Sequence, residues 1–205
     1  MSEVVRKRAR RADAERSRHA VLEAAIRLLD DRPDATLEQM AVAAGVTRQT
    51  VYAHFGSRRD LLLAVADELT RTYLAALDSA NLDQGPAIDA LMRVIHVGST
   101  SARLSSSAAL TVAAVIDPAE SQAQHKPVVE RIVTLARRGQ QSGDFDNQVP
   151  AEWLAAATIA LSHTTAAETA AGRLPAADAE AILLRSVMQI YGVEPCVPRP
   201  PRSAP

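Results

Sequence analysis

Aromatic residues, cysteine and glycine are all scarce in this sequence of 205 residues. Phe, Trp and Tyr make up 3% of it, although hydrophobic residues of every kind make up 47%. The interior must therefore consist mainly of Ala, Leu, Val and Ile, and with only eight glycines this composition favours helices. Alternation of polar and apolar residues never persists for long enough to indicate a strand. We therefore expect an all-α fold.

The single cysteine, Cys196, excludes a disulfide within the chain. It lies in a Pro-rich tail, residues 193–205, which we expect to be extended or disordered, and there it is either incidental or a redox switch. The sequence has no apolar run of about 20 residues and no apolar segment after its charged N-terminus, so we expect neither a membrane span nor a signal peptide. These absences predict a cytoplasmic protein with no membrane partner.

Sequence motifs of catalysis are missing as well. The chain has no P-loop, nucleophile elbow or Gly-rich dinucleotide motif, so we expect neither an enzyme nor a cofactor. Glu15, His19 and Glu23 are spaced four residues apart on one helical face and could bind a metal ion. The same spacing suits an exposed ion-pairing face, and on that interpretation we expect no metal site.

Charge is distributed unevenly along the chain, although the net charge is −1. Residues 1–60 carry 12 Lys and Arg against 9 Asp and Glu, whereas residues 61–205 carry 11 against 15. The run RKRARR at 6–11 predicts a basic arm, residues 1–13, that either adds contacts to nucleic acid or is a solvated terminus. The basic excess near the N-terminus is where a polyanion would bind.

The most informative pattern begins at Thr36. Thr36 and Gln39 have the spacing of a capping box, which indicates the start of a short helix with Leu37 and Met40 on its apolar stripe. Gly45 stands where a left-handed backbone angle would end this helix. A first short helix and a tight turn are therefore expected between residues 36 and 46.

A second short helix follows the turn. Thr47 is placed to cap it, and we expect it to span Arg48–His54. Ser57, with Asp60 three residues later, predicts the cap of a further helix. Two short helices joined at a glycine are typical of the helix-turn-helix, which places its second helix in the DNA major groove.

The second short helix turns a polar face outward. Arg can donate two hydrogen bonds to guanine and Gln can pair with adenine, whereas Thr, Tyr and His more often contact phosphates. An ordinary helical hairpin with a polar surface would show the same pattern, so these residues alone leave both interpretations open. The residues on this face are Thr47, Arg48, Gln49, Thr50, Tyr52 and His54.

The segment around this pattern, roughly residues 15–65, resembles the DNA-binding domain of the TetR-type transcriptional repressors. Arg58 is a departure, because the family usually has Lys there; the charge is kept, but a planar fork and a point charge are not equivalent. The matching residues are Thr36, Met40-Ala41, Ala44-Gly45-Val46-Thr47, Thr50-Val51-Tyr52, His54-Phe55, Ser57 and Leu61-Leu62, preceded by Ala24-Ala25 and Leu28-Leu29.

The resemblance implies a role for each matching residue. Thr47, Arg48 and Gln49 fall where the family reads bases, and Val46, Val51, Phe55 and Ala41 fall in its small core. The positions where the family holds phosphates are Thr36, Thr50, Tyr52, His54 and Arg58.

Periodicity predicts further helices along the rest of the chain. We expect a first helix over 14–31, a long helix from Arg58 to near Ala80, and a loop over 119–127 before a helix that starts at Pro127. The other expected helices are 86–101, 104–115, 151–170 and 176–191. The expected organisation is a basic arm at 1–13, a three-helix DNA-binding domain at 14–60, a helical regulatory and dimerisation domain at 61–192, and the tail.

The last two predicted helices have broad apolar stripes and abundant alanine, which allows close helix contact. Two such helices from each of two subunits would form a four-helix bundle, and the resemblance favours this homodimer over packing within one subunit. The residues predicted for this interface are Leu154, Thr158, Leu161, Leu183, Leu184, Val187, Met188 and Tyr191.

The resemblance also implies a small-molecule effector held between the central helices. His96 and His163 lie on largely apolar helices, where each could contact a ligand or be a satisfied histidine. The candidate ligand residues are Tyr73, His96, Thr100, Leu104, Leu110, Trp153, His163 and Thr164. We therefore expect a homodimeric repressor that binds a palindromic operator and is released by a ligand; the alternatives are a dimeric scaffold without DNA binding and a metal-binding protein.

Overall fold

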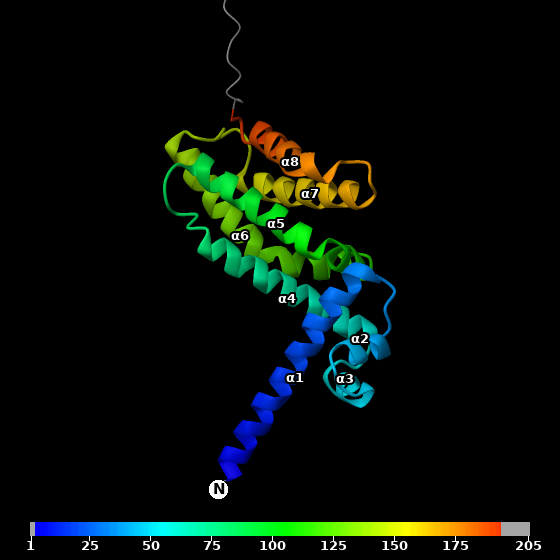
Figure 1. Ribbon diagram of the computed structural model, residues 1–205. Helices are drawn as coiled ribbons and strands as arrows, with labels where there is room; N and C mark the ends of the chain where they lie inside the picture. Colours follow the sequence, from blue (N-terminus) through cyan, green and yellow to red (C-terminus); the bar gives the residue numbers. More distant parts are fainter. Residues whose placement is uncertain (1–2, 194–205) are drawn as a thin grey trace, which may run out of the picture. The chain divides into compact units, whose positions relative to one another are not determined.

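The computed structural model describes residues 3–193, and every regular element within that range is an α-helix (Figure 1). The expected all-α fold is confirmed. The Pro-rich tail from residue 194, with Cys196, lies outside the described residues. The helices are α1 Glu3–Asp31, α2 Leu37–Ala43, α3 Arg48–His54, α4 Arg58–Ser79, α5 Ala87–Ala113, α6 Pro118–Ser142, α7 Ala151–Ala170 and α8 Ala176–Ile190.

Helix α1 begins far earlier than predicted. It runs as a single helix from Glu3, so residues 3–13, expected as an arm separate from the first helix, are part of that helix. The segment EVVRKRARRAD contains neither Gly nor Pro and is rich in Arg, Lys and Ala, which are good helix formers. The N-terminal part of α1 extends past the short helices α2 and α3 (Figure 1).

Helix α5 is one element where two were predicted. It spans Ala87–Ala113 without the break expected between 101 and 104. The serine-rich segment there contains no proline, and serine alone does not end a helix that its neighbours hold in place. Within the second half of α5, the backbone N–H of Ala108 donates to Asp30 Oδ1 of α1 at 3.0 Å, which ties the helix to its neighbour.

Helix α6 replaces the loop that was predicted over 119–127. Asp117 Oδ1 accepts from the backbone N–H of Glu120 at 2.9 Å, and Glu120 Oε2 accepts from that of Asp117 at 3.2 Å. This reciprocal cap starts the helix at Pro118, a position where proline loses nothing. Pro127, predicted to start the helix, lies inside it instead.

The described chain divides into two compact units. Unit 1 comprises the residues up to Ala76 together with Thr100–Val128, and unit 2 comprises Leu77–Ser99 together with the residues from Val129 onward. The predicted division assigns DNA binding to residues 14–60 and regulation and dimerisation to residues 61–192. This division remains a prediction. The buried core of unit 1 includes Val21, Leu22, Ala25, Leu29, Met40, Ala41, Val51, Phe55, Leu61, Leu62, Val65, Ala108 and Val112.

Two aromatic rings anchor the core of unit 2. The rings of Phe145 and Tyr191 meet edge to face with centroids 4.8 Å apart, and both are almost fully buried. Gly139 leaves room for this pair, because a Cβ added there would lie 2.1 Å from the Phe145 ring. Helices α7 and α8 pack side by side in this unit (Figure 1).

The Tyr191 hydroxyl completes a buried hydrogen-bond chain. Thr158 Oγ1 donates to the Leu154 carbonyl at 2.8 Å, so the Tyr191 hydroxyl, 3.2 Å from Thr158 Oγ1, is the donor in that pair. Burial raises the pKa of Tyr191 to about 12, and the hydrogen bond between Tyr191 and Thr158 opposes this only in part.

Replacing Tyr191 with phenylalanine should lower stability at neutral pH by about 0.5–1.5 kcal/mol, because one buried hydrogen bond is lost. The unfolded phenol ionises near pH 10 and the folded one near 12, so this group's stabilisation is full below about pH 10 and is lost as the pH rises toward 12. Urea unfolding at pH 7 and pH 11 should therefore show a smaller gap between variant and wild type at pH 11. A gap that does not shrink would contradict the buried-phenol assignment.

The predicted dimer interface needs correction. Five of its eight residues lie in the interior of this chain: Leu154, Thr158, Leu183, Val187 and Tyr191. A second copy cannot reach side chains that the chain's own core encloses. The apolar stripes were identified correctly, but they face neighbouring helices of the same chain. Leu161, Leu184 and Met188 are half-buried and remain candidates.

Candidate nucleic-acid interface

The first short helix of the interface starts at a complete capping box. Thr36 Oγ1 accepts from the backbone N–H of Gln39 at 3.3 Å, and Gln39 Oε1 accepts from that of Thr36 at 2.8 Å. Leu37, Met40 and Ala41 of α2 point inward and are buried. The predicted cap and stripe are both confirmed, and they fix α2 on the core of unit 1.

A glycine makes the turn between α2 and α3. Gly45 has φ +68°, in the left-handed region where any other residue would be strained. The N–H groups of Gly45 and Val46 donate to the carbonyls of Val42 and Ala41 at 3.1 and 3.0 Å, which satisfies carbonyls at the end of α2. The predicted turn is confirmed, and it sets the angle at which α3 leaves.

Helix α3 is capped by Thr47, whose Oγ1 accepts from the backbone N–H of Thr50 at 3.1 Å. Val51 is its one buried residue, and Phe55 follows it into the core. The guanidinium of Arg18 from α1 lies 5.4 Å from the centroid of the Phe55 ring, so α1 contacts this end of α3. Because one side of α3 is anchored, its other side is held outward.

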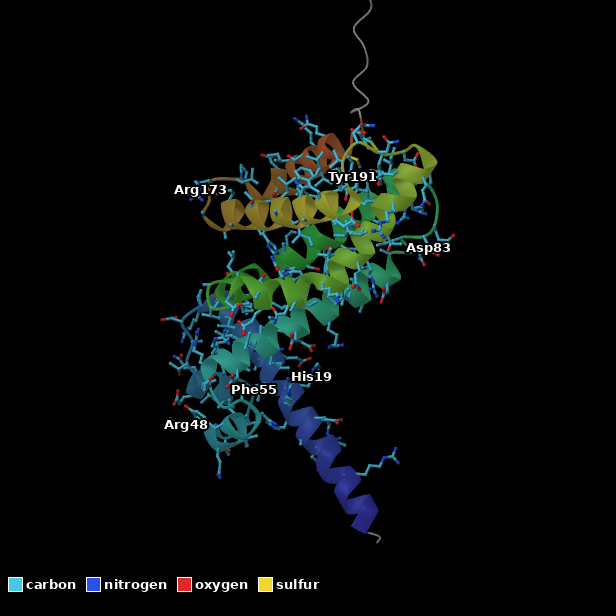
Figure 2. All side chains as sticks on the ribbon, turned by 180° about the vertical axis from the view of Figure 1, so that it is seen from behind. His19, Arg48, Phe55, Asp83, Arg173 and Tyr191 are labelled. Carbon is cyan, nitrogen blue, oxygen red and sulfur yellow. The ribbon has the colours of Figure 1, made fainter. Side chains whose placement is uncertain are left out.

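The outward side carries the predicted base-reading residues. Thr47, Arg48 and Gln49 are all exposed, and in Figure 2 Arg48 lies at the outer edge of the three-helix group. Thr50 and His54 are half-buried beside them. The structure therefore brings the predicted residues of α3 together on one accessible surface.

Three of the predicted phosphate-contacting residues lie together beside α3. Thr36, Tyr52 and Arg58 line one open groove of about 400 Å³, with Gly56 and Ser57 at its edge. Ser57 Oγ accepts from the backbone N–H of Asp60 at 3.1 Å, so the predicted cap of α4 is confirmed. The groove joins the start of α2 and the start of α4.

Arg58 has a structural role that the sequence did not reveal. Its Nε donates to the carbonyl of Ala35 at 3.0 Å and its Nη2 to that of Pro33 at 2.7 Å. The side chain thereby ties the α1–α2 loop to the start of α4. Lysine at this position could not make both contacts in a fixed plane, so arginine suits the site.

Glu38 is an interface residue that the sequence alone did not point to. Its carboxylate lies 2.9 Å from Arg48 Nη1 and lines the same groove as Tyr52. Its pKa is lowered, first by hydrogen bonding to its own backbone N–H, then by Thr36 and by the charge of Arg48. The pKa of Arg48 is raised by its hydrogen bond to Tyr52 and by Glu38. The available sequence signal was the acidic residue in the first turn of α2.

Five of the eight predicted ligand residues are exposed in this chain. His96 Nδ1 forms a surface hydrogen bond with Glu180 Oε1 at 3.0 Å, and Leu104 and Trp153 are 72% and 54% exposed. His163 and Thr164 are exposed as well. For these five residues a place in a ligand site stays a prediction, because helical periodicity does not reveal which face another element covers. Tyr73, Thr100 and Leu110 are half-buried and remain candidates.

An open groove in unit 2 includes none of the predicted ligand residues. It has a volume of about 410 Å³ and mixes leucines with charged side chains, among them an Arg131–Asp78 pair joined by bonds of 2.8 and 3.1 Å. Arg138 donates from Nη1 to the carbonyl of Asp83 at 2.7 Å, while its Nε and Nη2 are buried without a partner. Charges of both signs line this groove, so its lining favours no one class of ligand.

Two other kinds of site are missing from the described residues. Among them, no group of three or more His, Cys, Asp and Glu side chains could hold a metal ion. His19 Nε2 lies 3.2 Å from Glu23 Oε1 on α1. Within the same part of the chain, no helix has both the length and the apolar character needed to cross a bilayer.

Known proteins match both the sequence and the fold. The family model for bacterial regulatory proteins of the tetR family matches residues 21–65, which contain α2 and α3. The transcriptional repressor LfrR of Mycolicibacterium smegmatis is 43% identical over 82 residues, 40% of this chain and 43% of the repressor. The transcriptional regulator NfxB of Pseudomonas aeruginosa is 28% identical over 116 residues, 56% of this chain and 62% of NfxB.

The similarity to LfrR extends over the fold. The crystal structure of LfrR from Mycobacterium smegmatis in complex with proflavine is 28% identical to this chain with a TM-score of 0.68, covering 86% of this chain and 96% of that one. In sequence, the chain spans 43% and 62% of the lengths of LfrR and NfxB. Within this fold, α2, the turn at Gly45 and α3 form a helix-turn-helix. In residues 21–65 the chain is therefore similar to the bacterial regulatory proteins of the tetR family, and over the fold it is similar to LfrR.

Proposed function

We propose that this protein is a transcriptional regulator that binds a palindromic DNA operator as a homodimer and represses transcription. The observation that carries the proposal is the outward face of α3, which presents Arg48 and Gln49 from a helix capped at Thr47 and anchored by Val51. A helix held in this way can enter a major groove without rearranging its backbone.

The chemistry of the surface suggests a division of labour. Arg48 and Gln49 have the donors and acceptors for guanine and adenine edges, and Thr47 stands beside them at the helix N-terminus. Thr36, Thr50, Tyr52, His54 and Arg58 surround these residues and suit phosphate oxygens. In this arrangement the outer ring sets position and the three residues in the middle set sequence preference.

The direct test is selection of binding sites from a random duplex library by the purified full-length chain. The expected result is a two-fold symmetric sequence, with half-sites spaced to suit two copies of α3. Recovery of unrelated sequences with no shared half-site would contradict sequence-specific binding and would favour the scaffold alternative.

The homodimer would be formed by the outer face of α7 together with α8. Trp153 is 54% exposed, and Ala156 and Ala160 are exposed on the same helical face. A helix that is apolar on nearly every side normally has every side covered, and the small alanines allow close approach of a second copy. The half-buried Leu161, Leu184 and Met188 are also proposed to contribute.

Ala160→Arg should convert the dimer to a monomer, because each copy would place a long cation against its own symmetry mate. Sedimentation velocity measures the change directly. Helix content should be retained, since Ala160 is exposed in the single chain. The matched control is Ala109→Arg on α5, also an exposed alanine, which should stay dimeric. Two dimeric variants would contradict the proposed interface.

A small-molecule effector is proposed to release the protein from its operator. LfrR has been crystallised with proflavine, which supports testing planar aromatic cations first. Tyr73, Thr100 and Leu110 are the remaining candidate contacts. A coupling of about 1–3 kcal/mol between the two sites would change operator affinity some 5- to 150-fold. Gel-shift titration with proflavine and a metabolite panel tests this, and no change with any compound would count against it.

A further inference from the structure

A carboxylate lies in the middle of the surface proposed to face DNA phosphates. Glu38 is 2.9 Å from Arg48 Nη1, and the Arg48 guanidinium carbon is 5.2 Å from the centroid of the Tyr52 ring. Arg48 Nη2 also donates to the Tyr52 hydroxyl at 3.4 Å. A negative charge here repels the DNA backbone, so its position requires a compensating benefit.

The carboxylate is held in this position by local structure. Glu38 belongs to the first turn of α2, where the helix dipole favours a negative charge. Hydrogen bonds from its own backbone N–H and from Thr36 stabilise the charged form and lower its pKa. Glu38 is therefore held charged beside Arg48.

An arginine can contact DNA in two ways with different electrostatics. A free guanidinium gains from any phosphate, because the attraction depends on net charge and not on sequence. Paired with a carboxylate, the guanidinium has little net charge but still offers directed N–H groups to the acceptors of guanine. Compared with a free arginine, the Arg48–Glu38 pair should therefore lose more affinity for random DNA than for a correct site.

The geometry leaves enough donors for reading a base. A guanidinium has five N–H donors, of which Glu38 and Tyr52 each engage one. The remainder suffices for a bidentate contact to guanine, and the Tyr52 ring beneath restricts the tilt of the plane. Glu38 and Tyr52 together fix where those donors point.

We propose that Glu38 is a specificity-determining residue. Its carboxylate offsets the positive charge of Arg48, which weakens binding to the phosphates of random DNA, and it orients the Arg48 guanidinium toward the acceptors of guanine. The inference rests on the proposed function, since it concerns the same surface. Glu38 acts through Arg48 and makes no contact with a base itself.

The test compares Glu38→Gln with wild type on two duplexes of equal length, the selected site and a random sequence, over a range of salt concentrations. Glu38→Gln should bind random duplex about three- to tenfold more tightly at 0.1 M salt, with the selected site changed by less than about twofold. The salt slope on random DNA should steepen by about 0.9 per protomer, because Arg48 becomes free to neutralise a phosphate.

Two controls isolate the route through Arg48. Glu23→Gln removes the same charge from α1, away from the groove, and should leave the ratio of the two affinities unchanged. In an Arg48→Ala background, Glu38→Gln should no longer tighten binding to random duplex. Equal tightening with and without Arg48 would overturn the proposal, since the effect would be general repulsion of phosphates. Circular dichroism confirms that each variant is folded.

Other outcomes are equally decisive. Loss of preference at a single cytosine in Glu38→Gln would overturn the proposal, because Glu38 would then accept a hydrogen bond from that base directly. An unchanged affinity ratio, with wild type still selecting a site, would refute this inference alone. A wild-type chain that selects no site would refute the proposed function instead.

Discussion

Arg48→Ala should weaken binding to the selected operator far more than binding to random DNA. A bidentate contact from arginine to guanine discriminates by about 5- to 150-fold per base, and a dimer makes the contact twice. Random duplex should lose much less, because Arg48 is already paired with Glu38 in the free protein. Fluorescence anisotropy with both duplexes gives the two ratios.

The matched control for Arg48→Ala is Arg27→Ala. Arg27 is an exposed arginine on α1, 4.0 Å from Glu23, and lies outside the proposed interface. It should leave the ratio of specific to random affinity unchanged. Equal losses on both duplexes for Arg48→Ala would show that this residue contacts only the DNA backbone, and the proposed base reading would be wrong.

Phe145→Ala should lower the stability of the folded chain far more than Tyr191→Phe does. Phe145 is 4% exposed, packs edge to face on Tyr191, and fills the space that Gly139 leaves. Removing a buried phenylalanine costs about 3–5 kcal/mol, since contacts are lost and the cavity is only partly refilled. Urea unfolding followed by circular dichroism measures the change.

An exposed residue provides the comparison for Phe145→Ala. Leu104→Ala removes a large apolar side chain that is 72% exposed, and it should change stability by no more than about 0.5 kcal/mol. A loss below about 1 kcal/mol for Phe145→Ala would contradict its place in the core of unit 2, since removal of a buried ring costs several times that amount. The Arg48→Ala variant should unfold like wild type, which separates binding effects from stability effects.

Local signals made the helix-turn-helix predictable. The capping box of Thr36 and Gln39, the cap at Thr47 and the turn at Gly45 each depend on residues within a few positions, and each is present as expected. Such signals specify short helices because their first N–H groups need nearby acceptors.

Longer helices were harder to delimit for a related reason. The Asp117–Glu120 cap has the same form as the others, but the proline at 127 suggested a later start for α6. In α5 the serine-rich segment suggested a break that packing overrides. Tertiary contacts, such as the hydrogen bond from the backbone N–H of Ala108 to Asp30, determine where such helices begin and end. The sequence near a helix end does not reveal these contacts.

The direction that a helix face points was the least predictable property. The apolar residues of α7 and α8 form the stripes expected, yet Leu154 and Val187 face the chain's own core. Periodicity predicts which side chains share one face of a helix, but it does not predict which element packs against that face. Glu38 was missed likewise, because its partner Arg48 is on a different helix and close only after folding.

The most direct measurement of sequence-specific binding by a symmetric pair is the affinity and stoichiometry of the full-length chain on its selected site, from low to physiological salt. We expect two chains for each site, an affinity that falls steeply with salt, and an affinity at least about 10³ times higher than for random duplex. One chain for each site, or equal affinity for selected and random duplexes at every salt concentration, would contradict DNA reading by paired copies of α3.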